Sequence, residues 1–538
     1  MAKMTGAQAL VAQLVSEDVD TIFGLPGVQI MPLFDVLYDR QNAVRLIHTR
    51  HEQATTYMAD GYAKVTGKAG VALVTPGPGA FNAAAGLGTA YASSSPVLLV
   101  SGQIPSTSLG KRRGELHEVE EQLEVFNSIT KWNHRVTRVE EIPEAVHEAF
   151  RHLKTGRPRP VELEIPPDTL AAEGAAQIIE AEDYAKPAGA PAEIERAARL
   201  LAAARRPTII AGGGTVSAGA AAELVELAEL LQAPVITTQQ SKGAIPDEHP
   251  LYFGVNYVYM SPIEELIAQS DAVLAVGTRL MIRDFEADRL PNLVQIDIDP
   301  SEIGKNFPAE VGIEADAKEA MAGLIRALRG AGPTRQSRAE EIAARRQAFG
   351  SKVRELAPRQ LDMMDSLRAE LDEDAVVVGG VTNLGYWSTI AYPMNAPRRF
   401  LTSSYFGTLG YAFPTALGAK VASPDRQVVA LCGDGGFLYA TEELSTALRH
   451  GIDVIAIVFN NQAYGASRWD QMHRYDKRFI GTDLQNPDFM KLAEAYGVTG
   501  LRCDAAGLGQ TLRKALSVKT PVLLEVEVPI MMPPFQIV

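Results

Sequence analysis

The stretch Gly433-Asp434-Gly435-Gly436 directly follows an apolar run, Val428 to Leu431, and decides the fold of the C-terminal part of this chain. A second apolar run, Val454 to Phe459, ends at Asn460-Asn461. Between the two runs, Thr441 to His450 has helical spacing and is followed by a glycine. This order predicts a βαβ unit, whose two parallel strands end on the same edge of a sheet.

We therefore expect Asp434 and Asn461 to meet at that edge. Mg²⁺ and Ca²⁺ prefer hard oxygen ligands, which a carboxylate, an amide and a backbone carbonyl supply beside phosphate oxygens. The glycines around Asp434 let the backbone approach such a phosphate closely. Taken singly, Gly-Asp-Gly is better explained as a turn and Asn-Asn as a strand end. Their occurrence together favours a metal-diphosphate site.

A second segment, near the N-terminus, supports this interpretation. It comprises Arg50-His51-Glu52-Gln53-Ala54 and continues through Met58 to Lys68. Together the two segments resemble the thiamine-diphosphate (ThDP) enzymes, and the N-terminal one resembles the pyrimidine-binding segment of their acetolactate-synthase-like branch. The resemblance implies that Asp434, Asn461 and the backbone carbonyl of Ala463 are the metal ligands.

The same resemblance gives Glu52 the role of the catalytic glutamate. A carboxylate there hydrogen-bonds the aminopyrimidine nitrogen and promotes the imino tautomer, so that the cofactor deprotonates its own thiazolium carbon. The alternative for Glu52 is a surface glutamate at a helix start, where the helix dipole favours a negative charge.

Three further segments match the same family. Thr75 to Asn82 resembles the glycine-rich turn near the pyrimidine, and Ser101 to Pro105 a recurrent segment of the branch that places Gln103 near the substrate as a catalytic group. Phe406 to Gly410 resembles the segment whose bulky residue, here Leu409, wedges between the cofactor rings; the alternative is an ordinary core leucine. The cofactor-binding residues implied are Glu52, Pro76, Asn82, Gly407, Leu409, Gly433, Asp434, Gly435, Gly436 and Asn461.

The substrate end of the site departs from the acetolactate synthases. Leu116-His117-Glu118 stands where they carry Phe-Gln-Glu, so His117 is either an acid/base group or an exposed histidine with a local hydrogen bond. Ala466 to Trp469 stands where they carry Met-Val-x-x-Trp, one residue shorter. Arg468 is either a bidentate clamp for a substrate carboxylate or part of a surface salt bridge. The substrate candidates are Gln29, Arg468 and Trp469.

Length and composition bound the architecture. A chain of 538 residues predicts about three domains. The fold class expected is α/β, with three Rossmann-like doubly wound domains and parallel sheets. Pro- and Ala/Glu-rich stretches, from Pro166 to Pro191 and from Gly330 to Phe349, separate them. The expected domains are pyrimidine-binding (1–170), middle (188–330) and diphosphate- and Mg-binding (355–530).

The middle domain raises the question of FAD. Relatives in this branch often hold FAD with an arginine in a Gly-x-Arg-Phe-Asp-Asp-Arg-like segment. This chain has Gly277 to Arg283, which keeps Arg279 but lacks the Asp-Asp pair. FAD is therefore one possibility, and a middle domain that binds no nucleotide is the other.

Charge and targeting signals bear on whether the protein binds nucleic acid or a membrane. The balance of 51 basic against 65 acidic residues gives a net charge of −14, which offers no basic footprint for nucleic acid. No run has the apolar length of a membrane span, and the N-terminus lacks signal-peptide architecture, so we expect no membrane partner and a cytoplasmic protein. Cys432 and Cys503 lack metal-ligand spacing.

The resemblance implies Mg²⁺- and ThDP-dependent decarboxylation of a pyruvate-like 2-oxo acid, followed by carboligation to a second carbonyl acceptor. One alternative is a simple decarboxylase that releases an aldehyde, and another is an inactive relative with a binding or regulatory role. In the family, the domains of Glu52 and Asp434 face each other from different subunits. We therefore expect a homodimer, and a homotetramer is also found in the branch.

Overall fold

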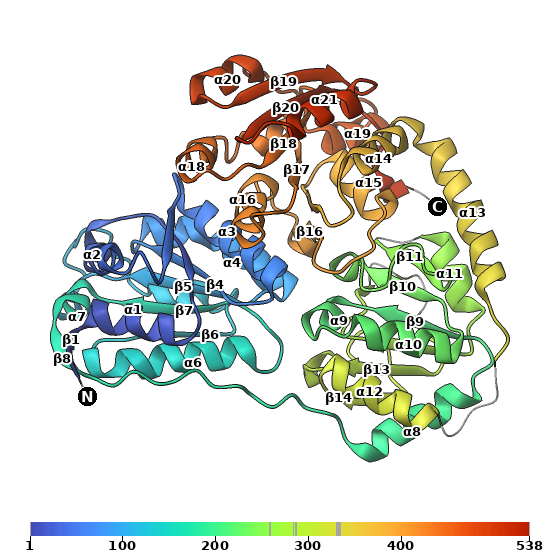
Figure 1. Cartoon of the computed structure of the whole chain (residues 1–538), viewed down its shortest axis with the longest axis horizontal. Helices are drawn as coiled ribbons and strands as arrows, with labels where there is room; N and C mark the ends of the chain where they lie inside the picture. The colour runs from blue at the N-terminus through green and yellow to red at the C-terminus, as the bar shows by residue number, and fades with distance from the viewer. Residues whose placement is uncertain (1, 258–259, 283–284, 286–287, 330–334, 537–538) are drawn as a thin grey trace.

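Three parallel sheets organise the chain in the computed structural model, which describes residues 2–257, 260–282, 285, 288–329 and 335–536. Each sheet has six strands, all parallel, with helices on both faces. Figure 1 shows the three units: the N-terminal one in blue and cyan, the middle one in green and the C-terminal one in orange and red. The predicted α/β class with three Rossmann-like domains is confirmed.

The N-terminal unit has the strand order β3-β2-β4-β5-β7-β6. A two-stranded antiparallel sheet, β1 with β8, ties residues 173–176 to the start of the chain. The strands are β1 (Ala2–Thr5), β2 (Thr21–Gly24), β3 (Arg45–His48), β4 (Gly70–Val74), β5 (Val97–Gly102), β6 (Trp132–Arg135), β7 (Val161–Ile165) and β8 (Glu173–Ala176). The helices are α1 (Gly6–Ser16), α2 (Met31–Asp39), α3 (Glu52–Thr66), α4 (Pro78–Ser93), α5 (Gln122–Phe126), α6 (Ile142–Lys154) and α7 (Pro167–Ala171).

The middle unit has the strand order β11-β10-β9-β12-β13-β14. Its central strands β9 and β12 are buried along their whole length, as expected for parallel strands covered on both faces. The strands are β9 (Pro207–Ala211), β10 (Val235–Thr238), β11 (Tyr252–Asn256), β12 (Ala272–Val276), β13 (Leu293–Asp297) and β14 (Val311–Glu314). The helices are α8 (Pro191–Ala203), α9 (Gly213–Ser217), α10 (Ala221–Leu231), α11 (Ser261–Ala268) and α12 (Ala317–Leu328).

The C-terminal unit has the strand order β16-β15-β17-β18-β20-β19. The predicted βαβ unit is present, because β17 and β18 are adjacent and parallel and Gly433 pairs with Phe459. The strands are β15 (Val376–Gly379), β16 (Phe400–Thr402), β17 (Val428–Gly433), β18 (Ile455–Asn460), β19 (Thr499–Asp504) and β20 (Val522–Glu527). The helices are α14 (Pro358–Glu370), α15 (Asn383–Ala391), α16 (Ala412–Ala422), α17 (Asp434–Phe437), α18 (Glu443–His450), α19 (Gly465–Arg474), α20 (Phe489–Tyr496) and α21 (Leu508–Leu516).

The N- and C-terminal units share one hydrophobic core through the pair α3 and α16. Two glycines let the helix backbones touch. A Cβ on Gly61 would lie 2.1 Å from the carbonyl oxygen of Thr415, and a Cβ on Gly418 would lie 2.0 Å from that of Met58. Since the helix that begins at Glu52 is held this closely, its position is fixed against the C-terminal unit.

Two connections join the units. Residues 177–190 form an irregular segment, and α13 (Ala339–Leu356) runs along the right edge of Figure 1 from the middle unit to the C-terminal one. The predicted linker residues Gly330 to Pro333 lie outside the described residues, as does Arg283 of the expected flavin segment. Among the helices that the structure describes, none combines the length and the apolar character needed to cross a membrane.

Candidate active site

Asp434 stands where β17 ends, as the first residue of α17, and is buried. Its carboxylate accepts a hydrogen bond of 2.7 Å from Nδ2 of Asn486. Burial raises the pKa of the Asp434 carboxyl, while hydrogen bonds from Asn486 and from the backbone N–H groups of Gly435, Gln462 and Ala463 oppose that rise. The loop after β18 therefore meets Asp434, as the βαβ geometry predicts.

The loop after β18 is held by its own asparagines. Oδ1 of Asn461 accepts the N–H of Ala463 at 3.1 Å, and Oδ1 of Asn460 accepts the N–H of Gln462 at 3.1 Å. Gln462 has a φ of 54°, in the left-handed region that asparagine and glycine adopt more readily. This turn brings Asn461 and the backbone of Ala463 to the same sheet edge as Asp434.

The donor set at this edge fits a hard cation. It contains the carboxylate of Asp434, the amide of Asn461 and the carbonyl of Ala463, which are all oxygen donors. A further oxygen, Oδ1 of Asn486, is buried and has no hydrogen-bond partner among the residues described. Within that part of the chain, no group of three or more His, Cys, Asp or Glu side chains is placed to hold a metal. Sequence reasoning missed Asn486, because no motif or spacing marks it.

Glu52 begins α3, whose N-cap is His51. Oε2 of Glu52 accepts a hydrogen bond of 3.0 Å from Nδ2 of Asn82, near the start of α4. A Cβ on Gly79 would lie 3.3 Å from the other carboxylate oxygen, so the glycine leaves space beside Glu52. The fold thus brings Glu52 together with Asn82 and the glycine-rich turn that the sequence placed near the same ring.

The glycine-rich turn also meets the substrate candidates. Gly77, next to Pro76, has a φ of 59°, and a Cβ there would lie 2.7 Å from the carbonyl oxygen of His117. The Thr75 hydroxyl donates to Oε1 of Gln29 at 3.1 Å and lies 3.5 Å from Nδ1 of His117. Gln29 and His117 therefore form one polar cluster beside this turn.

Gln103 is placed differently. Its Nε2 donates to Glu164 at 2.7 Å, and its Oε1 accepts the N–H of Ile104 at 2.6 Å. The side chain is buried with both polar ends engaged inside the N-terminal unit. This geometry favours a structural role, and the catalytic role of Gln103 stays a prediction.

The predicted wedge segment lies between α4 and the Asp434 loop. Thr408 and Thr89 hydroxyls are 2.8 Å apart, and Cδ2 of Leu409 would be 3.7 Å from a Cβ on Gly436. Gly407 adopts a φ of 65°. Leu409 is only partly buried, unlike an ordinary core leucine, which suits a side chain that contacts a ligand.

Arg468 and Trp469 lie on α19, a helix whose ten residues are all at least partly exposed. The Arg468 guanidinium forms an ion pair of 2.5 Å with Asp483 and lies 4.1 Å from the ring centroid of Phe479. Trp469 stacks on His473 at 4.2 Å. Arg468 thus makes the salt bridge that was the alternative to a substrate clamp, and the clamp stays a prediction.

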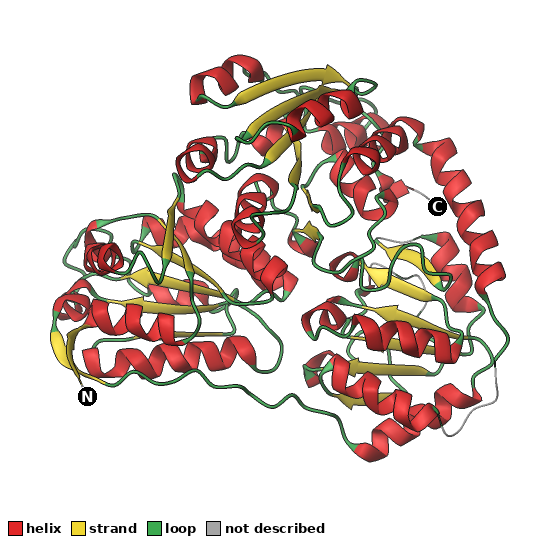
Figure 2. Ribbon diagram, viewed as in Figure 1, coloured by secondary structure: helices red, strands yellow, loops and turns green. Residues whose placement is uncertain are grey.

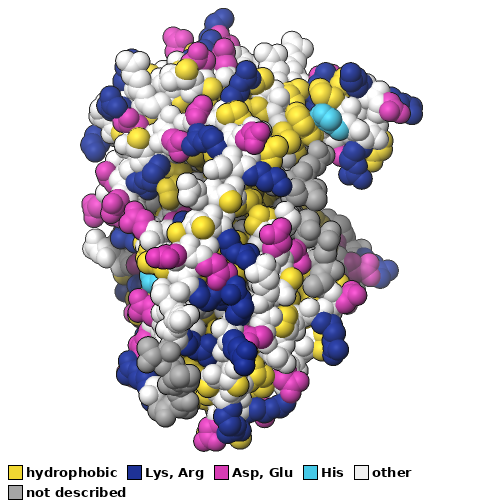
Figure 3. All heavy atoms as spheres, turned by 90° about the vertical axis from the view of Figure 1, so that its right-hand side faces the viewer, with side chains coloured by type: hydrophobic (Ala, Val, Ile, Leu, Met, Phe, Trp, Pro, Cys, Tyr) yellow, Lys and Arg dark blue, Asp and Glu magenta, His cyan; other side chains and the backbone are white. Residues whose placement is uncertain are grey.

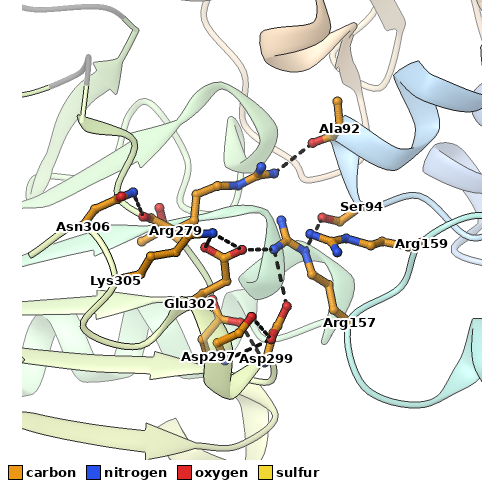
Figure 4. Close-up of polar contacts among 12 residues, drawn as sticks. Ala92, Ser94, Arg157, Arg159, Arg279, Asp297, Asp299, Glu302, Lys305 and Asn306 are labelled. Atoms are coloured by element: carbon orange, nitrogen blue, oxygen red, sulfur yellow. Dashed lines mark hydrogen bonds and ion pairs between the residues drawn. The ribbon is translucent and has the colours of Figure 1, made fainter. Parts of the chain in front are cut away.

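A separate cavity of about 640 Å³ is lined by residues of all three units, among them Gly213, Gly214 and Arg279. Arg279 donates to the carbonyl of Ala92 at 2.9 Å, and its guanidinium lies 4.6 Å from the ring centroid of Tyr405. Figure 4 shows a second arginine, Arg157, reaching from the N-terminal unit to Glu302 of the middle unit. The arginines at this cavity are therefore already engaged in contacts between units.

Comparison with known proteins matches each unit to a family. Residues 4–125 match the N-terminal TPP binding domain of thiamine pyrophosphate enzymes, residues 194–324 the central domain and residues 380–526 the C-terminal TPP binding domain. The chain belongs to the thiamine pyrophosphate enzymes. Thiamine pyrophosphate is another name for ThDP, so the family resemblance seen in the sequence is confirmed.

The relatives place this thiamine pyrophosphate enzyme in the acetolactate-synthase-like group. A probable acetolactate synthase large subunit of Methanocaldococcus jannaschii is 36% identical, over 97% of this chain and 92% of its own. An acetolactate synthase of Arthrospira platensis is 34% identical, over 98% and 94%. A probable 2-ketoarginine decarboxylase, AruI of Pseudomonas aeruginosa, is 39% identical, over 92% and 88%.

Proposed function

We propose that this enzyme decarboxylates a pyruvate-like 2-oxo acid and joins the remaining fragment to a second carbonyl acceptor, as an acetolactate synthase does. The observation that carries the proposal is the pairing of two site halves in a chain with acetolactate synthase relatives along nearly its whole length. One half is Glu52 with Asn82, and the other is Asp434 with the loop at Asn461. The presence of Glu52, Asp434 and Asn461 argues against an inactive relative.

A simple decarboxylase is the second candidate, because the relative AruI is named as a probable decarboxylase. The two candidates share the first half of the reaction and differ in what the fragment meets next. A proton releases an aldehyde, whereas a second carbonyl gives a carboligation product.

We assign Mg²⁺ to Asp434, Asn461 and the carbonyl of Ala463, with the diphosphate beside Gly433, Gly435 and Gly436. When bound, ThDP supplies the carbon nucleophile that attacks the 2-oxo group. Glu52 would hold a proton at the pyrimidine nitrogen, and the hydrogen bond of 3.0 Å from Asn82 orients its carboxylate. Leu409, which lies beside Gly436, would contact the bound cofactor.

For the substrate, the cluster of Gln29 and His117 provides hydrogen-bonding groups beside the glycine-rich turn. Arg468 and Trp469 contribute from α19. Arg468 acts as a carboxylate clamp only after it leaves Asp483, so substrate binding on this side includes an exchange of one carboxylate for another.

FAD is the second cofactor to test, and the 640 Å³ cavity is its site in this proposal. Gly213 and Gly214 allow close approach of a phosphate, and the buried Nζ of Lys242, which lines the cavity, has no hydrogen-bond partner in the described part of the chain. A visible flavin absorbance band in the purified protein establishes FAD, and its absence after incubation with FAD establishes a flavin-free middle unit.

The assembly proposed is a homodimer or a homotetramer in the cytoplasm. Three aromatic side chains in the segments of the site are exposed in the single chain: Phe81 by 43%, Phe406 by 43% and Tyr439 by 47%. A second copy that covers these rings completes the site. Figure 3 shows one side of the molecule. Acidic and basic side chains are interspersed over it, and hydrophobic side chains gather in its upper part.

Product analysis tests the proposal. The purified protein is incubated with ThDP, Mg²⁺ and pyruvate, and acetolactate, acetaldehyde and the loss of pyruvate are measured. Acetolactate establishes carboligation, and acetaldehyde alone establishes the decarboxylase. If pyruvate is not consumed while ThDP is bound, pyruvate is not the donor, and a panel of larger 2-oxo acids then identifies the donor or shows the protein to be inactive.

A further inference from the structure

Glu443 is a fully buried carboxylate that reaches from the C-terminal unit to the turn before Glu52. It is the first residue of α18. Its Oε1 accepts the backbone N–H of Arg50 at 3.0 Å and that of His51 at 2.9 Å, and its Oε2 lies 3.2 Å from the Arg50 nitrogen. The hydroxyl of Thr446 donates to Oε2 at 2.5 Å. One side chain therefore binds the backbone N–H groups of the two residues that precede Glu52.

The same turn is held to the C-terminal unit on both flanks. On the β3 side, Nε2 of His450 accepts the N–H of His48 at 3.2 Å. On the α3 side, Nε2 of Gln53 donates to the carbonyl of Tyr439 at 2.7 Å. Between these two contacts, Glu443 holds the backbone of the turn at Arg50 and His51. The direction in which α3 presents its first residue thus depends on a segment of the opposite unit.

We propose that Glu443 is a positioning residue for Glu52, which transmits the docking of the C-terminal unit to the catalytic carboxylate. The inference rests on the proposed role of Glu52. Burying a charge is costly unless hydrogen bonds compensate for it, and here three donors aim at one carboxylate. A reacting group displaced by about 1 Å loses about a hundredfold in rate, so a small rotation of the peptides before Glu52 has a large effect.

The protonation of Glu443 provides a signature of this role. Burial raises the pKa of its carboxyl to about 7, while the Thr446 hydroxyl and the N–H groups of Arg50 and His51 oppose the rise. The ionised carboxylate accepts from all of these donors, but the protonated form must donate its own hydrogen and loses one of them. The grip on the turn therefore weakens as the pH falls through about 7.

Other titratable groups surround Glu443, and they differ in how they respond to pH. Burial lowers the pKa of His450 to about 4 and also lowers that of His48, so His450 stays neutral near pH 7. Charged or titratable groups near it in sequence or on its partners are Arg45, Arg50, His51, Glu52, Glu442 and Arg449, and further along α3 lie Asp60, Tyr62 and Lys64. All of them remain present when Glu443 alone is changed.

The test uses the ThDP- and Mg²⁺-loaded holoenzyme of E443Q, E442Q, E52Q and T446V. It measures the exchange of the cofactor's thiazolium proton for deuterium and the turnover number, both as functions of pH. Above pH 7, E443Q should exchange the proton about ten- to a hundredfold more slowly than the wild type. The wild type should also slow as the pH falls through about 7, and E443Q should lack this decline, which we call the acid limb. T446V should move that limb to higher pH, since it removes a donor to the ionised form. E442Q, the matched control, should keep the wild-type exchange rate above pH 7, with its acid limb at the same or slightly lower pH, because the Glu442 charge helps to raise the pKa of Glu443.

The outcomes separate the inference from its premise. If E52Q exchanges as fast as the wild type, the role of Glu52 is wrong and the inference has no basis. If E52Q is slow while E443Q keeps the wild-type rate and acid limb, only the positioning role is overturned. Should E443Q fail to fold, T446V decides, because a limb that stays at the wild-type pH contradicts the proposal and a shifted limb supports it.

Discussion

Nδ2 of Asn486 donates a 2.7 Å hydrogen bond to the carboxylate of Asp434, although Asp434 begins α17 and Asn486 lies in the loop before α20. The same nitrogen lies 2.9 Å from Oδ1 of Asn460, so Asn486 joins the aspartate to the asparagine pair. Because its own oxygen is buried and unpartnered within the described structure, Asn486 is available to the proposed cation site.

Replacing Asn486 with Ala should weaken Mg²⁺-dependent ThDP binding about ten- to a hundredfold, since one hydrogen bond to a charged group contributes about 1.5–3 kcal/mol. The measurement is a titration of the apoprotein with ThDP at several Mg²⁺ concentrations, followed by protein fluorescence. Gln485→Ala, at the preceding position, is the control. An unchanged Mg²⁺ requirement would show that Asn486 serves only the loop.

Replacing Asp434 with Ala should abolish the Mg²⁺ dependence of ThDP binding rather than only weaken it. Asp434 is the one carboxylate among the assigned ligands, and a hard cation loses most of its attraction without it. The thermal unfolding midpoint with and without Mg²⁺-ThDP measures this, because a bound ligand stabilises the folded state. Equal stabilisation of D434A and the wild type would contradict the metal assignment.

The E52Q variant should bind ThDP with nearly wild-type affinity but turn over at least about 100-fold more slowly, as expected when a proton-transfer group is lost. Glutamine has the shape of glutamate and still offers an oxygen acceptor to Asn82, so folding should be preserved. Equilibrium ThDP binding and pyruvate consumption are measured on the same preparation. Wild-type turnover would remove Glu52 from the mechanism.

Glu443 should make the stability of the protein fall as the pH rises. Its carboxyl has a folded-state pKa of about 7 against an ordinary value of 4.5. A raised carboxyl pKa means that the folded state binds the proton more tightly, so this contribution is complete below about pH 4.5 and is lost as the pH rises through 7. Urea unfolding of the wild type and E443Q at about pH 5 and pH 8 should differ by up to roughly 3 kcal/mol. Parallel pH dependences in the two proteins would refute this.

The contact between α3 and α16 should be intolerant of any side chain at Gly418. A Cβ there would lie 2.0 Å from the carbonyl oxygen of Met58, so G418A should destabilise the protein by at least about 2 kcal/mol. Gly350, on α13, has no atom within 4 Å of its Cβ position, and G350A should instead stabilise by about 0.5–1 kcal/mol. Thermal unfolding compares the two, and similar shifts would mean that the helices part easily.

The residues at the sheet edges were predictable because each motif there directly follows its strand in the sequence. Apolar strands, a glycine turn and the asparagine pair predict β17, β18 and the meeting of Asp434 with the following loop. The resemblance likewise placed Glu52 beside the glycine-rich turn, where its partner Asn82 lies.

Contacts between distant segments were not predictable in this way. Asn486, Glu443 and the Arg157–Glu302 ion pair act through side chains whose partners are more than fifty positions away, and no periodicity records such a partner. Gln103 shows the converse. Its segment matched the family, but its burial with Glu164 depends on packing inside the sheet.

The exposure of α19 has a practical consequence. No residue of that helix is buried, so its side chains contribute little to the core, whereas α3 is clamped through Gly61. If the proposed substrate roles of Arg468 and Trp469 hold, a library that randomises these two positions of α19 would sample new donor acids at small cost in folding. In the proposed site, substrate selectivity and cofactor activation thus belong to separate elements, and only the exposed helix α19 tolerates broad variation.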